Sequence, residues 1–151
     1  MKRNNTGFTI YELIMTIAII AILSAVAVPS MIDWRERAKL KGAMENLRAD
    51  LQWAKSRAIR DQNLVAVVFE TNRYVINNGA GATVRTRQLA AGVVLDLGAS
   101  TVPADPDNMS NLKAEFNSRG RCASGGTLVL EDTLGDQRQV SINPLGQIRQ
   151  E

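Results

Sequence analysis

The stretch LIMTIAIIAILSAVAVPSMI, residues 13–32, decides the architecture of this chain, because none of its 20 residues is charged. A helix rises about 1.5 Å per residue, so this segment would be roughly 30 Å long, the thickness of the hydrocarbon core of a bilayer. A secretory signal has a shorter apolar region of about 7–15 residues, followed by a small-residue cleavage site. Ala25-Val26-Ala27 could supply that site, which keeps a secreted β protein as an alternative. The length of the segment and the helical pattern that continues after it favour a transmembrane helix.

The next segment, residues 34–60, has the pattern of an amphipathic helix. Its apolar side chains recur every three or four residues, at Leu40, Met44, Leu47, Leu51, Ala54 and Ala58. This is the spacing of one face of a helix. We therefore expect one long helix over residues 8–60, whose second half lies on its own globular domain. Pro29 should kink or loosen this helix, and Gly42 is a second weak point.

From residue 61 onward the pattern changes to short runs of β-forming residues separated by turns rich in Gly, Asn and Pro. We expect strands at Leu64–Phe69, Tyr74–Ile76, Thr83–Leu89, Val93–Leu97, Leu112–Phe116, Thr127–Leu130 and Gln139–Ile142. Residues 98–111 are expected to form a loop. A long helix followed by several short strands predicts an α+β fold, with the helix packed on an antiparallel sheet or a small β-sandwich.

The composition argues against an enzyme. The 151 residues contain no histidine, which excludes histidine acid–base chemistry and histidine metal ligands. The single cysteine, Cys122, cannot form an intrachain disulfide or a cysteine-rich zinc site. Asp105, Asp107 and Asn108 lack the spacing of a calcium loop and indicate a solvated turn. We expect no catalytic residue, no metal ion and no cofactor.

The charge gives no broad basic field. The net charge is +3, and removing Lys2 and Arg3 from the 18 basic residues leaves 16 against 15 acidic ones. Nucleic-acid binding would therefore need a local patch. Arg119, Arg121 and Arg149 are the candidates, but no aromatic residue for base stacking lies among them. We interpret them first as surface charges beside a glycine turn.

The segment Gly7-Phe8-Thr9-Ile10-Tyr11-Glu12 ends a short basic leader and begins the apolar helix. It resembles the prepilin peptidase signal of type IV pilins and type II secretion pseudopilins, which has Glu at the fifth residue of the mature chain. The resemblance implies that residues 1–7 are a leader peptide, that the chain is cut between Gly7 and Phe8, and that the new amine of Phe8 is methylated. Pro29 lies where many pilins carry a helix-loosening proline.

The rest of the chain is similar to the GspH/FimT/FimU group of minor pilins and pseudopilins. The segments that carry this similarity are residues 47–59, the strand at 65–69, and residues 116–120, 126–128 and 144–149. DNA-binding members of the group tend to carry paired arginines after a glycine near the C-terminus. Here Gly146-Gln147-Ile148-Arg149 contains one arginine, which argues against DNA binding.

The resemblance implies a division into a leader at 1–7, a transmembrane or filament-core helix at 8–33, an amphipathic helix at 34–60 and a β-rich domain at 61–151. It implies a minor type IV pilin, processed by prepilin peptidase and assembled into, or priming, a pilus. The alternatives are a GspH-like pseudopilin of a type II secretion system and a DNA-binding minor pilin for DNA uptake. The expected partners are other pilins or pseudopilins, the peptidase and the inner-membrane assembly platform.

The expected location is the bacterial inner membrane, with the precursor crossing once and its globular domain in the periplasm, before assembly into a pilus or pseudopilus. A count of flanking charges gives the opposite orientation, because Lys2 and Arg3 precede the span whereas Arg35, Arg37, Lys39 and Lys41 follow it. We follow the motif, because the charge rule is statistical. Glu12 would then pair with the amine of Phe8 in its own or a neighbouring subunit, because an unpaired carboxylate in an apolar core is costly.

Overall fold

The computed structural model describes residues 8–150, and one helix and nine strands lie within that range. In chain order they are α1 (Ile10–Arg60), β1 (Val65–Phe69), β2 (Arg73–Asn78), β3 (Thr83–Gln88), β4 (Val93–Asp96), β5 (Ala104–Asp105), β6 (Asn108–Phe116), β7 (Gly126–Asp132), β8 (Gln137–Ile142) and β9 (Ile148–Gln150). Two compact units divide between Arg35 and Glu36. We call residues 8–35 the first unit and residues 36–150 the second, or β-rich, unit.

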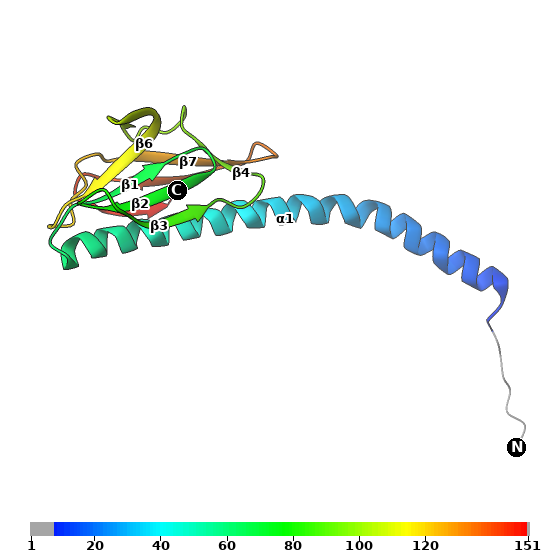
Figure 1. The fold of residues 1–151 in the computed structure, drawn as a ribbon. Coiled ribbons are helices and arrows are strands. Elements are labelled where there is room, and N and C mark those ends of the chain that lie inside the picture. The colour runs from blue at the N-terminus through cyan, green and yellow to red at the C-terminus, as the bar shows by residue number, and fades with distance from the viewer. Residues whose placement is uncertain (1–7, 151) are drawn as a thin grey trace, which may run out of the picture. The chain divides into compact units, whose positions relative to one another are not determined.

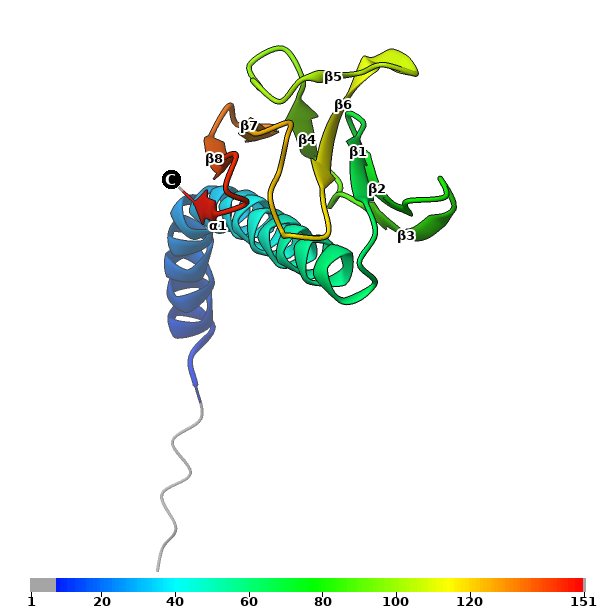
Figure 2. The same ribbon diagram turned by 90° about the vertical axis from the view of Figure 1, so that its left-hand side faces the viewer.

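The strands of the second unit form two antiparallel sheets. The larger has the order β3-β2-β1-β6-β5 and the smaller the order β4-β7-β8-β9. Figure 1 shows both sheets on one side of the C-terminal part of α1, and Figure 2 shows β1–β3 and β7–β8 on opposite sides of the view with this helix below them. The expected α+β fold, a long helix packed on antiparallel sheet, is confirmed.

The helical stripe predicted from the sequence forms the core of this unit. Its six members are each no more than 2% exposed: Leu40, Met44, Leu47, Leu51, Ala54 and Ala58. Phe69, Tyr74 and Phe116 from the larger sheet are fully buried in the same cluster as Leu128 and Leu130 from the smaller one. One apolar face of α1 therefore organises the packing of both sheets.

Two features differ from the sequence-based expectation. The segment 98–111 is not only a loop, because it contains β5 and the first half of β6. These residues are largely polar and exposed, and main-chain hydrogen bonds of a hairpin form there without an apolar pattern to reveal them. Strand β9 was also missed, because its three residues are too few to show an alternation and are placed by pairing with β8.

A buried carboxylate joins α1 to the larger sheet. Asp50 is 3% exposed and accepts hydrogen bonds from Tyr74 Oη at 2.8 Å, Arg85 Nη1 at 2.6 Å and Arg87 Nε at 2.6 Å. The guanidinium of Arg85 also lies 4.5 Å from the centre of the Trp53 ring. Burial alone would raise the pKa of Asp50, but the donors of Tyr74, Arg87 and Arg85 outweigh it and hold this pKa below its ordinary value. We call these five residues the Asp50 clamp.

Four turns of the β-rich unit are built from one short pattern, Asx-x-x-Gly. They begin at Asn78, Asn117, Asp132 and Asn143. In each turn the main-chain N–H of the first residue donates to the carbonyl oxygen of the residue four positions later. The N–H of that later residue donates in return to the side-chain oxygen of the first. The glycine at the fourth position has a positive φ between 73° and 82°, a conformation that other residues adopt at a cost.

Two of these turns allow a matched test of the glycine requirement. A Cβ at Gly81 would meet no atom within 4 Å, whereas a Cβ at Gly146 would lie 1.9 Å from the carbonyl oxygen of Gly120. We expect Gly81→Ala to lower the free energy of unfolding by about 1 kcal/mol, the cost of the backbone conformation alone. We expect Gly146→Ala to cost at least roughly 3 kcal/mol, because the backbone must also move. Urea unfolding of the detergent-solubilised chain, followed by circular dichroism, measures both; equal losses would contradict the packing argument.

The Asp50 clamp should be visible in the pH dependence of stability. We expect Asp50→Asn to lower the free energy of unfolding by about 3 kcal/mol near neutral pH, because two arginines lose a buried partner. A folded-state pKa below the unfolded value means that Asp50 stabilises the fold above about pH 4, and this contribution is lost as the pH falls further. The difference between wild type and Asp50→Asn should therefore be constant from about pH 5 to 7 and shrink at lower pH. Glu45→Gln is the control, since its exposed contact with Lys41 contributes less than about 1 kcal/mol.

Candidate functional site

The first turn of α1 begins at a side-chain cap. The main-chain N–H of Glu12 donates to Thr9 Oγ1 at 3.3 Å, and the N–H of Leu13 donates to the carbonyl oxygen of Thr9 at 3.2 Å. Thr9 is therefore the N-cap of a helix that begins at Ile10. Glu12 lies in the first turn, where a carboxylate interacts favourably with the positive end of the helix dipole. Glu12 thus lies in the capped first turn of α1, four residues after Phe8.

The first unit consists of apolar helix whose described side chains are all exposed. This holds for residues 8–28 and 30–35, with Phe8 85% exposed. An 18-residue window in α1 has a mean hydropathy of 2.4, and none of it is buried. By length and composition α1 can cross a membrane, and a signal sequence near an N-terminus has the same two properties. Such a surface needs lipid or other apolar helices to cover it.

The polar side chains inside this apolar segment are satisfied within the helix. The hydroxyl groups of Thr16, Ser24 and Ser30 donate to the carbonyl oxygens of Leu13, Ile20 and Ala27, at 2.7–2.9 Å. A hydroxyl group with an internal acceptor enters an apolar environment at much lower cost than one without. The helix can therefore be buried in lipid or against other helices.

The predicted processing and assembly residues fall into this unit. Gly7, with the rest of the leader, lies outside the described residues. Phe8 and Glu12 flank the helix start. At Pro29 α1 continues without a break in its assignment, so loosening of the helix at this proline stays a prediction.

The three candidate arginines lie on two separate elements. Arg119 and Arg121 are exposed in the turn that begins at Asn117, and Arg149 is exposed in β9, where it pairs with Ser141. Two turns pack together here, as the N–H of Cys122 donates to the carbonyl oxygen of Pro144 at 3.3 Å.

The β-rich unit offers these arginines no aromatic partner for stacking. Between residues 36 and 150 the aromatic side chains are those of Trp53, Phe69, Tyr74 and Phe116. The last three are fully buried, and Trp53 is half-buried beside Arg57 and Arg85. Base stacking is therefore not available around Arg119, Arg121 or Arg149.

The acidic residues near β5 surround a lysine. The Lys113 Nζ lies 3.0 Å from Glu115 Oε1, 3.7 Å from Asp105 Oδ1 and 3.9 Å from Asp107 Oδ2. The hydrogen bond with Glu115 and the nearby carboxylates raise the pKa of Lys113. Within residues 8–150 no group of three or more acidic, cysteine or histidine side chains is arranged to hold a metal ion.

Cys122 lies in the core. Its side chain is fully buried, and burial raises the pKa of its thiol. The thiolate, which is the nucleophilic and metal-binding form, is therefore disfavoured. Cys122 packs as a small apolar residue.

Two polar features of the structure were not predicted from the sequence. The Thr9-x-x-Glu12 spacing is that of a helix capping box, and this signal could have located the start of α1 at Ile10. Asp50 lies between the buried Leu47 and Leu51 on the apolar stripe, and a charge at such a position indicates a partner on the facing sheet. The identity of that partner depends on the tertiary structure.

Comparisons with known proteins agree with this arrangement. Residues 43–146 match the family model "Type II transport protein GspH", and residues 2–28 match the prokaryotic N-terminal methylation motif. The type IV major pilin protein PilA of Myxococcus xanthus is 47% identical over 45 residues, which are 30% of this chain and 20% of that relative. The match thus spans about a fifth of the length of PilA.

Solved structures share the fold. The type IV minor pilin FimU of Pseudomonas aeruginosa is 21% identical, with a TM-score of 0.58 over 78% of this chain and 92% of FimU. The minor pseudopilin EpsH of the Vibrio cholerae type II secretion system is 14% identical, with a TM-score of 0.59 over 75% of this chain and 93% of EpsH. At these identities the likeness concerns the fold alone. The family match covers more than half of the chain, and the chain therefore belongs to the GspH family of pseudopilins and minor type IV pilins, a structural and non-enzymatic family that carries an N-terminal methylation motif.

Proposed function

We propose that this chain is a minor type IV pilin, anchored in the inner membrane as a precursor and assembled into, or priming, a pilus. The observation that carries the proposal is the combination of a methylation motif with an apolar helix whose described side chains are all exposed in the isolated chain. Membership of a family that contains both pilins and pseudopilins narrows the function to a filament subunit. The 45-residue similarity to a major pilin favours the pilus.

The proposed mechanism begins with cleavage between Gly7 and Phe8. The cut frees an amine beside the first turn of α1, and methylation of that amine keeps its positive charge. Glu12 is four residues away, and its carboxylate forms an ion pair with this amine in its own subunit or in a neighbour. In an apolar filament core the pair is worth more than at a wet surface, and an unpaired carboxylate is costly. Glu12 thus favours assembly in one register.

Residues 13–32 then exchange lipid for neighbouring helices. Both environments are apolar, so the exchange itself has little hydrophobic driving force. Close packing between helices and the ion pair of Glu12 make the filament more favourable than lipid. Pro29 removes one main-chain donor from the helix, and this lets the helix adapt to its neighbours in the filament.

The second candidate is a pseudopilin of a type II secretion system. The description of the matching family model and the fold of EpsH both favour it. The physical mechanism is the same in both systems, because the processing motif, the apolar helix and Glu12 serve either filament. DNA capture has less support, since Arg149 stands without a second arginine and the aromatic side chains of the β-rich unit are buried or half-buried.

Processing can be tested by the intact mass of the chain extracted from its native membrane. We expect the mass of Phe8–Glu151 plus one methyl group, because the motif places the cut after Gly7. A mass that begins after Ala27, or an uncut Met1, would contradict the filament mechanism and support a secreted protein or an unprocessed membrane protein.

The choice of system can be tested in a deletion strain. We expect the strain to lose most of its surface pili, counted by electron microscopy, and to recover them with the wild-type gene. Glu12→Gln should be cleaved normally but fail to restore pili, because a neutral side chain cannot pair with the amine. Glu45→Gln, with its exposed carboxylate in the β-rich unit, is the matched control and should restore them. Normal pili together with loss of secreted enzymes would identify the pseudopilin instead.

A further inference from the structure

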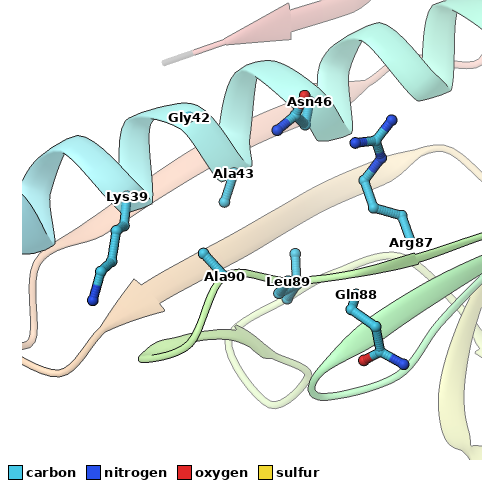
Figure 3. A pocket seen from close by; sticks show the side chains of 8 residues that line it. All are labelled: Lys39, Gly42, Ala43, Asn46, Arg87, Gln88, Leu89 and Ala90. Carbon is cyan, nitrogen blue, oxygen red and sulfur yellow. The ribbon is translucent and has the colours of Figure 1, made fainter.

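A groove lies between α1 and the segment that leads from β3 to β4. Its cavity is about 250 Å³, and it is lined by Lys39, Gly42, Ala43, Asn46, Arg87, Gln88, Leu89 and Ala90. Figure 3 shows Lys39 and Arg87 toward opposite ends, with the small side chains of Ala43 and Ala90 between them. All eight residues belong to the β-rich unit. The groove is therefore a feature of one compact body.

Gly42 has no explanation within the chain. It lies inside α1, where glycine is less favourable than alanine because of its backbone freedom. A Cβ at this position would meet no atom within 4 Å, so no internal contact requires the missing side chain. The missing side chain leaves the helix backbone open to close approach by another molecule.

The polar groups around the groove carry an excess of positive charge. Lys39 Nζ pairs with Glu36 at 2.7 Å, whereas Asp50 is shared by two arginines, Arg85 and Arg87. Within residues 8–150 Arg87 donates through Nε alone, and that bond goes to Asp50. Its Nη groups lie at the groove, where Figure 3 also places the side-chain amide of Asn46. A carboxylate is the protein side-chain group that can accept charge-assisted hydrogen bonds from a guanidinium and a further bond from an amide.

We propose that this groove receives an acidic side chain of a different pilin-fold subunit in the filament. The incoming segment crosses α1 at Gly42, where its backbone comes close to the helix. Its carboxylate accepts hydrogen bonds from Arg87 and Asn46. Arg85 and Arg87 share one carboxylate, that of Asp50, and the incoming group supplies a second negative charge. The small side chains of Ala43 and Ala90 leave room for it. This inference rests on the proposed function, since it requires a filament.

Two substitutions at Gly42 distinguish the effect of side-chain size in the groove from the effect of helix stability. Gly42→Ala and Gly42→Gln both replace glycine with a better helix former, and both side chains enter open space, so both variants should melt at or above the wild-type temperature. Only glutamine fills the groove. We expect Gly42→Ala to enter the sheared filament fraction of native cells like wild type, and Gly42→Gln to be reduced by roughly tenfold or more at equal membrane level. Equal amounts of both variants in filaments would overturn the proposal.

Photo-crosslinking identifies the occupant. p-Benzoylphenylalanine in place of Ala90, on the exposed rim, should crosslink in intact cells to a peptide containing Asp or Glu from another subunit with an N-terminal methylation motif. The crosslink should be lost in Gly42→Gln and absent when the same group replaces the exposed Ala123. Neutralising the crosslinked acid in that subunit should lower filament incorporation as much as Gly42→Gln does. Crosslinks to a second copy of this chain, to lipid, or unchanged by Gly42→Gln would overturn the proposal.

Failure of the proposed function and failure of the groove proposal give different results in these experiments. If the chain is uncut and absent from filaments, the proposed function itself is wrong. If wild type is processed and assembled but Gly42→Gln assembles equally well, the groove is no docking site and the proposed function stands.

Discussion

The β-rich unit depends on the hydrogen bonds that the buried carboxylate of Asp50 accepts from the larger sheet. It is buried against α1, and burial of a charge is tolerated only when partners replace the lost water. Tyr74, Arg85 and Arg87 supply three donors from two adjacent strands, and they fix how β2 and β3 lie on the helix. β3 is an edge strand and pairs with a neighbouring strand on one side only. The hydrogen bonds of Arg85 and Arg87 with Asp50 attach it to α1 as well.

The same helix serves two environments, and its sequence divides accordingly. In the β-rich unit one apolar stripe is buried and the other faces are charged. In the first unit every described side chain is exposed and most are apolar, so stability there must come from surroundings that the isolated chain does not supply. The serine and threonine hydroxyls already have acceptors within the helix, and the one acidic residue of the first turn is Glu12. A protein that stays monomeric in water would not expose such an apolar helix.

The stripe from Leu40 to Ala58 could be predicted from the sequence because helical periodicity depends only on neighbouring residues, and the six predicted positions are all buried. Most strands were found for the same reason. The hairpin of β5 and β6 could not be, since its polar residues are paired by main-chain bonds that leave no pattern. The partners of Asp50 could not be either, because Arg85 and Arg87 lie 35 and 37 residues away and only the fold brings them together. The leader and cut site could be inferred only through resemblance to a family, and the structure describes nothing before Phe8.

A low sequence identity is compatible with this fold for a physical reason. FimU and EpsH share it at 21% and 14% identity. The requirements visible in this chain are few: an apolar stripe on a helix, alternating inward residues on short strands, and glycines with positive φ in Asx-x-x-Gly turns. Many residues satisfy the first two, since a core accepts most apolar side chains of suitable volume. Only the turn glycines and the buried charge cluster demand particular residues. Surface positions are then free to differ between filament subunits, and a groove open at Gly42 can be specific to this one while the scaffold around it is shared.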